Sequence, residues 1–125
     1  MEKRVECEFD KVFPPSSTQS DVYEVLKDCA ESVVSGFNST VFAYGQTGSG
    51  KTFTTLGPDS DSCLFEPGPV HELAGIIPRA VRDVFKWIHK SSDRSCYSVF
   101  CSYIQACVFI SCGKVFVLQH IHIDL

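Results

Sequence analysis

The sequence lacks an apolar stretch at its N-terminus and lacks closely paired cysteines. Residues 1–6, Met-Glu-Lys-Arg-Val-Glu, carry charge where a secretory signal needs an apolar core, so we expect no export. The seven cysteines are odd in number and contain no Cys-x2-Cys pair, which argues against a disulfide framework and against a zinc site. We therefore expect reduced thiols and a cytoplasmic protein.

A strong excess of charge is also absent. The formal net charge is −4, which gives no reason to expect a nucleic-acid partner, so any affinity for phosphate has to be local. Apolar residues make up 44% and charged residues 21%, which is a globular composition. At 125 residues the chain is one domain at most, and it is small for a nucleotide-binding α/β sheet with helices on both faces.

Residues 95–112 contain no charged side chain, so a membrane span has to be considered. Serines and a glutamine interrupt this stretch, and its tyrosine, valine and phenylalanine residues favour strands. We expect buried strands there and no membrane segment. The strand pattern pauses at Gly113-Lys114 and resumes at Val115-Phe116-Val117-Leu118.

The N-terminal part of the chain has the pattern of a strand, a helix and a second strand. Alternation over Val5–Phe9 predicts a half-exposed peripheral strand. Thr18, with Asp21 three residues further on, predicts the start of a single amphipathic helix that ends at Gly36. Residues 40–44, Thr-Val-Phe-Ala-Tyr, predict a short buried strand.

That strand leads into a run of the form Gly-x4-Gly-Lys-[Ser/Thr], which predicts a nucleoside-triphosphate site. The glycines let the backbone curl so that successive N–H groups point at phosphate oxygens. Lys51 adds positive charge, Thr52 offers a hydroxyl to Mg²⁺, and a helix starting near Gly50 directs its positive end at the same anion. The expected nucleotide-binding residues are Gly45, Gln46, Thr47, Gly48, Ser49, Gly50, Lys51 and Thr52.

A long loop should follow this site. Gly57-Pro58 interrupts the helix, and proline and glycine recur up to Gly75. Such a loop is either a ligand-side insertion or a mobile flap, with disorder as the default expectation. Helical order resumes at Ile77-Pro78-Arg79. The apolar stripe of this helix is expected to face the core and comprises Val81, Val84, Phe85 and Ile88.

Several separated stretches together resemble the kinesin motor domain, in matching order and spacing. They are Phe9-Asp10-Lys11-Val12-Phe13, Thr18–Tyr23, Gly36–Thr52 and Gly75-Ile76-Ile77-Pro78-Arg79. The run Phe-Ala-Tyr-Gly-Gln-Thr-Gly-Ser-Gly-Lys-Thr is far more specific than the bare phosphate-loop motif. The resemblance implies an α/β P-loop NTPase fold with a central sheet flanked by helices, ATP and Mg²⁺ as cofactors, and a microtubule motor associated with the cytoskeleton.

The resemblance covers residues 1–105, with the phosphate loop at 45–52 and the family's fifth loop at 57–75. Residues 106–125 diverge from the family and form a tail of unknown origin. The family's two switch motifs, its microtubule-binding helix, its neck and its N-terminal adenine contact do not occur in this sequence. We therefore expect an incomplete motor that binds ATP with little independent hydrolysis, because the switches orient water and sense the γ-phosphate.

Other interpretations stay open at this point. A sheet with missing strands exposes apolar edges and faces, so the isolated chain could be unstable or aggregate. The chain could instead be a short regulatory module that binds nucleotide or a motor partner without generating force. A small P-loop kinase is a third function, which the bare motif allows and the kinesin-like stretches disfavour.

The histidines give no catalytic candidate. His120 and His122 would lie on the same side of a strand and could hold a metal together, but no third ligand is evident nearby. We interpret His71 as a loop residue and His89 as a polar residue near the C-terminus of a helix. We assign no catalytic residue, and the predicted metal contact is the Thr52 hydroxyl with Mg²⁺.

Overall fold

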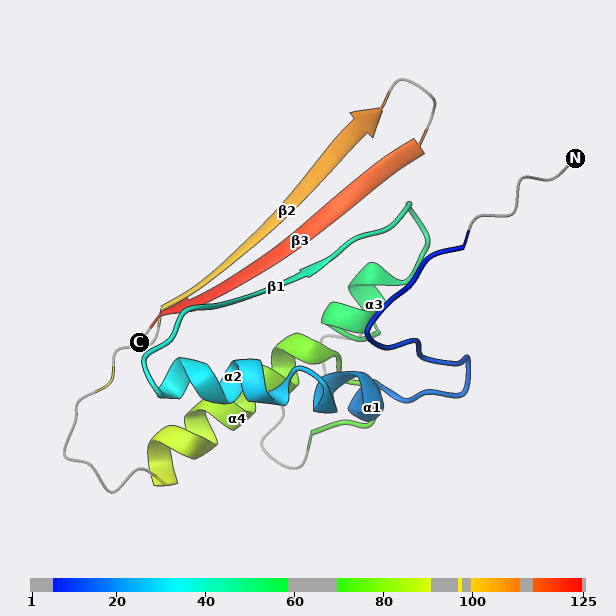
Figure 1. The fold of residues 1–125 in the computed structure, drawn as a ribbon. Coiled ribbons are helices and arrows are strands. Elements are labelled where there is room, and N and C mark those ends of the chain that lie inside the picture. The colour runs from blue at the N-terminus through cyan, green and yellow to red at the C-terminus, as the bar shows by residue number, and fades with distance from the viewer. Residues whose placement is uncertain (1–5, 59–69, 91–96, 98–99, 111–113, 125) are drawn as a thin grey trace, which may run out of the picture.

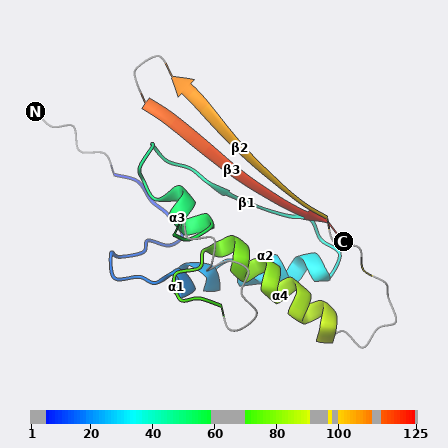
Figure 2. The ribbon, with the colours of Figure 1, turned by 180° about the vertical axis from the view of Figure 1, so that it is seen from behind.

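The computed structural model describes residues 6–58, 70–90, 97, 100–110 and 114–124. Within these ranges a three-stranded sheet forms one layer and the helices form the other (Figure 1). The view from behind shows the same two layers (Figure 2). The helices are α1 (Gln19–Glu24), α2 (Lys27–Val34), α3 (Lys51–Thr55) and α4 (Ile76–Lys90). Helices on both faces of the sheet, the arrangement expected of a nucleotide-binding α/β domain, are not seen among the described residues.

The sheet is antiparallel and its strand order is β1-β3-β2. Its strands are β1 (Ser39–Ala43), β2 (Phe100–Ile110) and β3 (Lys114–Asp124). The strand β3 lies between the other two, with Ala43 opposite Gln119 in β3 and Ile110 opposite Lys114. Antiparallel neighbours need only a short connection, whereas parallel ones need a crossover. The strand that pairs with β1 is β3, which lies within residues 106–125, the segment predicted to diverge from the family.

The strand β1 confirms the short strand predicted before the phosphate loop, whereas the prediction that this strand is buried is wrong. Its side chains alternate, half-buried at Ser39, Val41 and Ala43 and exposed at Thr40 and Phe42. Phe42 keeps 65% of its surface exposed. Because antiparallel sheets commonly leave one face to water, this alternation fits a sheet with helices on one side only.

The strand predicted over Val5–Phe9 is wrong for residues 6–9, and Val5 lies outside the described residues. Residues 6–10 are all exposed, and Phe9 has 68% of its surface exposed. An alternating pattern forms a strand only where one side can pack against a second layer. Both sides of this segment are exposed, so its alternation does not separate a buried side from an exposed one.

The start of α1 is predicted correctly. Thr18 is the N-cap, and its Oγ1 accepts a hydrogen bond from the Asp21 backbone N–H at 3.2 Å. The Asp21 carboxylate accepts in return from the Thr18 backbone N–H at 2.8 Å. This reciprocal capping box satisfies two backbone donors that a helix start leaves unpaired.

The prediction of one continuous helix up to Gly36 is wrong. The chain leaves the helix after Glu24, where the Leu26 N–H turns back to the Tyr23 carbonyl at 2.9 Å. A second helix, α2, begins at Lys27. Its end is as expected, because Gly36 adopts φ +88°, the left-handed conformation that commonly closes helices.

The core lies between α1, α2 and α4. Its buried apolar residues are Tyr23, Ala30, Val33, Ala74, Ile76 and Val84. The predicted stripe of α4 is confirmed in part: Val84 is 1% exposed, whereas Phe85 remains 46% exposed at the margin. None of the described helices is long and apolar enough to cross a membrane.

The two ends of the predicted loop at 57–75 lie against each other. A Cβ atom on Gly57 would fall 2.7 Å from the Leu73 carbonyl oxygen, and one on Gly75 would fall 2.6 Å from the Thr55 carbonyl carbon. The loop therefore leaves and returns through a narrow contact beside the C-terminal end of α3. Residues 59–69 lie outside the described residues, so disorder of the loop stays a prediction.

Candidate nucleotide-binding site

The phosphate loop, residues 45–52, connects β1 to α3 (Figure 1). Gly48 at φ +80° and Gly50 at φ +87° occupy the left-handed region, where an L side chain is strained. The Ser49 N–H donates to the Gln46 carbonyl oxygen at 3.2 Å and closes a turn. The loop thus has the curled backbone that a phosphate cradle needs.

Gly45 is a glycine for reasons of space. A Cβ atom there would lie 2.5 Å from Ser49 Oγ and 3.3 Å from Ser49 Cβ. The loop therefore folds back onto its own first residue. A side chain at position 45 would require the Ser49 side chain to move.

Lys51 is the buried member of the predicted set, with 9% of its surface exposed. Its Nζ donates to the Gln46 carbonyl oxygen at 2.7 Å, so the ammonium lies against the loop it is predicted to serve. A phosphate oxygen is a better acceptor than this carbonyl, because hydrogen bonds between charged groups are stronger than bonds to neutral oxygen. Lys51 is therefore placed to exchange Gln46 for an anion by a small side-chain movement.

The other predicted residues are more accessible. Gly45 is half-buried, and the remaining members are exposed: Gln46, Thr47, Gly48, Ser49, Gly50 and Thr52. Thr52 is the second residue of α3, next to Lys51. Residues 45–50 lie in the loop after β1, and Lys51 and Thr52 are the first two residues of α3.

The helix that follows contributes less than the sequence suggests. The dipole of a helix sums over its aligned peptide units, and α3 contains only five residues. An isolated helix of this length is unstable in water. Phosphate binding would therefore depend mainly on the loop N–H groups and on Lys51.

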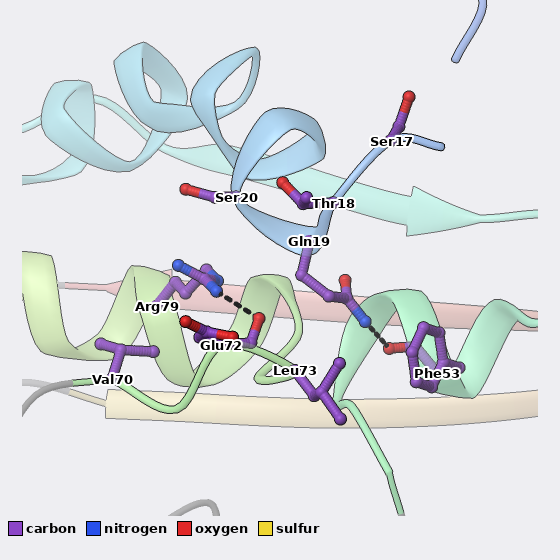
Figure 3. A pocket seen from close by; sticks show the side chains of 9 residues that line it. All are labelled: Ser17, Thr18, Gln19, Ser20, Phe53, Val70, Glu72, Leu73 and Arg79. Carbon is purple, nitrogen blue, oxygen red and sulfur yellow. Dashed lines mark hydrogen bonds between the residues drawn. The ribbon is translucent and has the colours of Figure 1, made fainter. Parts of the chain in front are cut away.

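Two hydrogen bonds from other parts of the chain hold α3 in place. Within the helix, Thr55 is 1% exposed and its Oγ1 donates to the Lys51 carbonyl at 3.0 Å. The Gly75 N–H donates to the Leu56 carbonyl at 3.0 Å. From α1, Gln19 Nε2 donates to the Phe53 carbonyl at 2.6 Å (Figure 3). Sequence reasoning missed Gln19, since its partner Phe53 lies 34 positions away and nothing local to Gln19 indicates it.

A cavity of about 550 Å³ lies beside this contact. It is lined by Ser17, Thr18, Gln19, Ser20, Phe53, Val70, Glu72, Leu73 and Arg79 (Figure 3). The Arg79 guanidinium donates to the backbone carbonyls of Ala74 and Glu72, each at 2.9 Å. Arg79 thereby fixes the returning end of the loop at 57–75 to the first turns of α4.

The structure gives no further metal site among the residues it describes. No group of three His, Cys, Asp or Glu side chains there could hold an ion. The hypothesis of a shared metal at His120 and His122 concerns β3, where these residues pair with Phe42 and Thr40 of β1. With Thr52 as the predicted protein contact, Mg²⁺ would be held largely by phosphate oxygens and water, its usual setting in nucleotide sites.

The remaining histidines have structural contacts. His71 Nδ1 lies 3.2 Å from the Leu73 N–H, from which it accepts a hydrogen bond within the loop. His89 Nδ1 lies 3.1 Å from the Phe85 carbonyl in the last turn of α4. These positions agree with the interpretation of His71 as a loop residue and His89 as a helix-end residue.

Comparison with known proteins supports the resemblance over most of the chain. The sequence model of the kinesin motor domain matches residues 1–107. Kinesin-like protein KIN-7N of Arabidopsis thaliana is 53% identical over 87 residues, which cover 69% of this chain and 9% of that protein. Kinesin-related protein 3 of Dictyostelium discoideum is 42% identical over 98 residues, covering 78% of this chain and 8% of that protein.

A human relative gives the same picture. Kinesin-like protein KIFC1 is 41% identical over 103 residues, covering 82% of this chain and 14% of that protein. The chain therefore spans a small part of the length of the curated relatives it matches.

Proposed function

Because the chain belongs to the kinesin motor domain family, we propose that residues 45–52 bind Mg²⁺·ATP as part of a microtubule-based motor. The family has a P-loop NTPase fold and uses ATP. The observation that carries the proposal is the loop between β1 and α3. There, left-handed Gly48 and Gly50 turn the backbone, and Lys51 lies against the turn.

Each predicted residue has a physical role in this proposal. The backbone N–H groups of the loop bind the phosphate oxygens, because a curled run of glycine-rich backbone presents several donors to one anion. Lys51 exchanges the Gln46 carbonyl for a phosphate oxygen. Thr52 contacts Mg²⁺ through its hydroxyl. The fit rests on the left-handed glycines Gly48 and Gly50 and on the Lys51 ammonium beside the turn.

The wider role is proposed from the family. The whole protein would bind microtubules, move along them and associate with the cytoskeleton in the cytoplasm. In the whole motor domain, β1 would belong to a central sheet flanked by helices. Residues 1–105 would be motor sequence and 106–125 a divergent segment, although β2 runs across this boundary without a break.

Equilibrium titration with a fluorescent ATP analogue and Mg²⁺ tests the nucleotide site. We expect saturable binding by the natural chain and at least about tenfold weaker binding by Lys51→Ala, since a charge-assisted phosphate contact is lost. Lys86→Ala is the matched control, because Lys86 is an exposed lysine on α4. Equal binding by the natural chain and Lys51→Ala would contradict the proposal.

A phosphate-release assay with and without microtubules tests the expected chemistry. The sequence contains neither switch motif, so we expect little hydrolysis by these residues alone. Release at the rate of a complete motor domain would show that other groups of this chain orient the attacking water.

A further inference from the structure

The helix that presents Lys51 and Thr52 has a carbonyl that its own backbone does not satisfy. In a longer helix the N–H of residue 57 would bond to the carbonyl of Phe53. Here the Gly57 N–H instead lies 3.3 Å from the Thr52 carbonyl, which also accepts from the Leu56 N–H at 2.8 Å. The last carbonyls of a helix have to find other partners.

Gln19 supplies that partner from another part of the fold. Its Nε2 lies 2.6 Å from the Phe53 carbonyl oxygen, across 34 positions of sequence. Gln19 is the first residue of α1 and is only 6% exposed. The capping box of Thr18 and Asp21 fixes the start of this helix, so it also fixes the position from which the amide reaches α3 (Figure 3).

The oxygen of the same amide indicates that stability alone does not explain why a glutamine stands at position 19. Gln19 Oε1 is buried and has no hydrogen-bond partner among the described residues. A buried acceptor without a donor destabilises a protein, whereas an apolar side chain of similar shape would avoid that cost. The Gln19 amide therefore makes one hydrogen bond through Nε2 and leaves one buried acceptor, Oε1, without a donor among the described residues.

We propose that Gln19 is a positioning residue for the phosphate loop, acting through its bond to the Phe53 carbonyl. Phe53 directly follows Thr52 in a helix too short to keep its own geometry. Holding this carbonyl fixes the rotation of α3 about its axis, and thereby the directions of Lys51 and Thr52. This inference rests on the proposed nucleotide site and adds to it a residue that lies outside the motif.

Gln19→Met tests the proposal, since methionine keeps the length of the side chain and removes both polar ends. We expect its affinity for the fluorescent ATP analogue with Mg²⁺ to fall about three- to tenfold, the effect of one hydrogen bond lost from a positioned site. Its melting temperature should stay near that of the natural chain, because loss of the bond is offset by removal of the orphan oxygen. Ser20→Ala, at the exposed next position of α1, is the matched control.

Hydrogen exchange of the backbone amides at residues 51–57 gives a readout that needs no nucleotide. Gln19→Met should exchange faster there than the natural chain and the control. Unchanged affinity together with unchanged exchange would overturn the proposal. A lower melting temperature together with faster exchange throughout the chain would also overturn it, because it would show general destabilisation. If the natural chain fails to bind nucleotide, the proposed function fails, and exchange confined to α3 still decides whether Gln19 anchors this helix.

Discussion

The Tyr23 hydroxyl donates a hydrogen bond to Asp83 Oδ2 at 3.0 Å and so joins α1 to α4 across 60 positions of sequence. Tyr23 is buried, with 6% of its surface exposed. Burial, and then the hydrogen bond to Asp83, raise the pKa of Tyr23 above its ordinary value of 10.0. The neutral phenol is therefore the form that the fold stabilises.

Stability should consequently fall at high pH. Because the pKa of Tyr23 is raised by folding, its contribution is complete below the unfolded value and is lost as the pH rises above it. Urea unfolding between about pH 8 and about pH 11 measures this loss. Tyr23→Phe should weaken the pH dependence and lower the free energy of unfolding at neutral pH by about 1 kcal/mol. An identical alkaline profile for both proteins would contradict the assignment.

The capping box of Thr18 and Asp21 predicts that the stability of the fold changes at acidic pH. Hydrogen bonds from the Thr18 backbone N–H, and then from its hydroxyl, lower the pKa of Asp21 below 3.8. The contribution of Asp21 is therefore present above its unfolded pKa and is lost as the pH falls through the lower, folded value. Asp21→Asn should flatten the stability profile in this acidic range. Thr18→Ala should lower the melting temperature by about 4 °C through loss of the cap.

The contact at the base of the 57–75 loop predicts two different glycine effects. Gly75→Ala would drive its Cβ into the backbone of Thr55, so we expect a loss of about 2 kcal/mol or more in the free energy of unfolding. At Gly36 the space is open but φ is +88°, so Gly36→Ala should cost only about 1 kcal/mol of backbone strain. Denaturant titration of both variants measures the difference. A smaller loss for Gly75→Ala than for Gly36→Ala would show that the loop base can move apart.

The phosphate loop offers a rescue experiment. Gly45→Ala should weaken binding of the ATP analogue about tenfold, because the new Cβ displaces Ser49 from the turn. The double variant Gly45→Ala/Ser49→Gly removes the atoms that clash and should recover most of the affinity. Ser49→Gly alone is the control for added flexibility. Failure of the double variant to recover would mean that Gly45 is needed for something other than space.

Local features were predictable because their causes lie a few residues apart. The pair Thr18 and Asp21 indicated a helix start, and the capping box forms there. The apolar residues before the phosphate loop indicated a strand, and β1 forms one residue from the predicted start. The motif itself placed the turn and the start of α3 at Gly50. The strand pattern over residues 6–9 failed, and these residues are all exposed.

The sequence by itself determined the family and the phosphate-loop motif. It also determined the start of α1 and the end of α2, since a capping box and a left-handed glycine follow from short-range hydrogen bonding and sterics. The tertiary structure alone decided that β3 lies beside β1, that Gly57 and Gly75 meet at the loop base, and that Gln19 holds the Phe53 carbonyl. These contacts join residues far apart in the chain. Local propensity carries no information about such partners, because their energies exist only once the elements have packed.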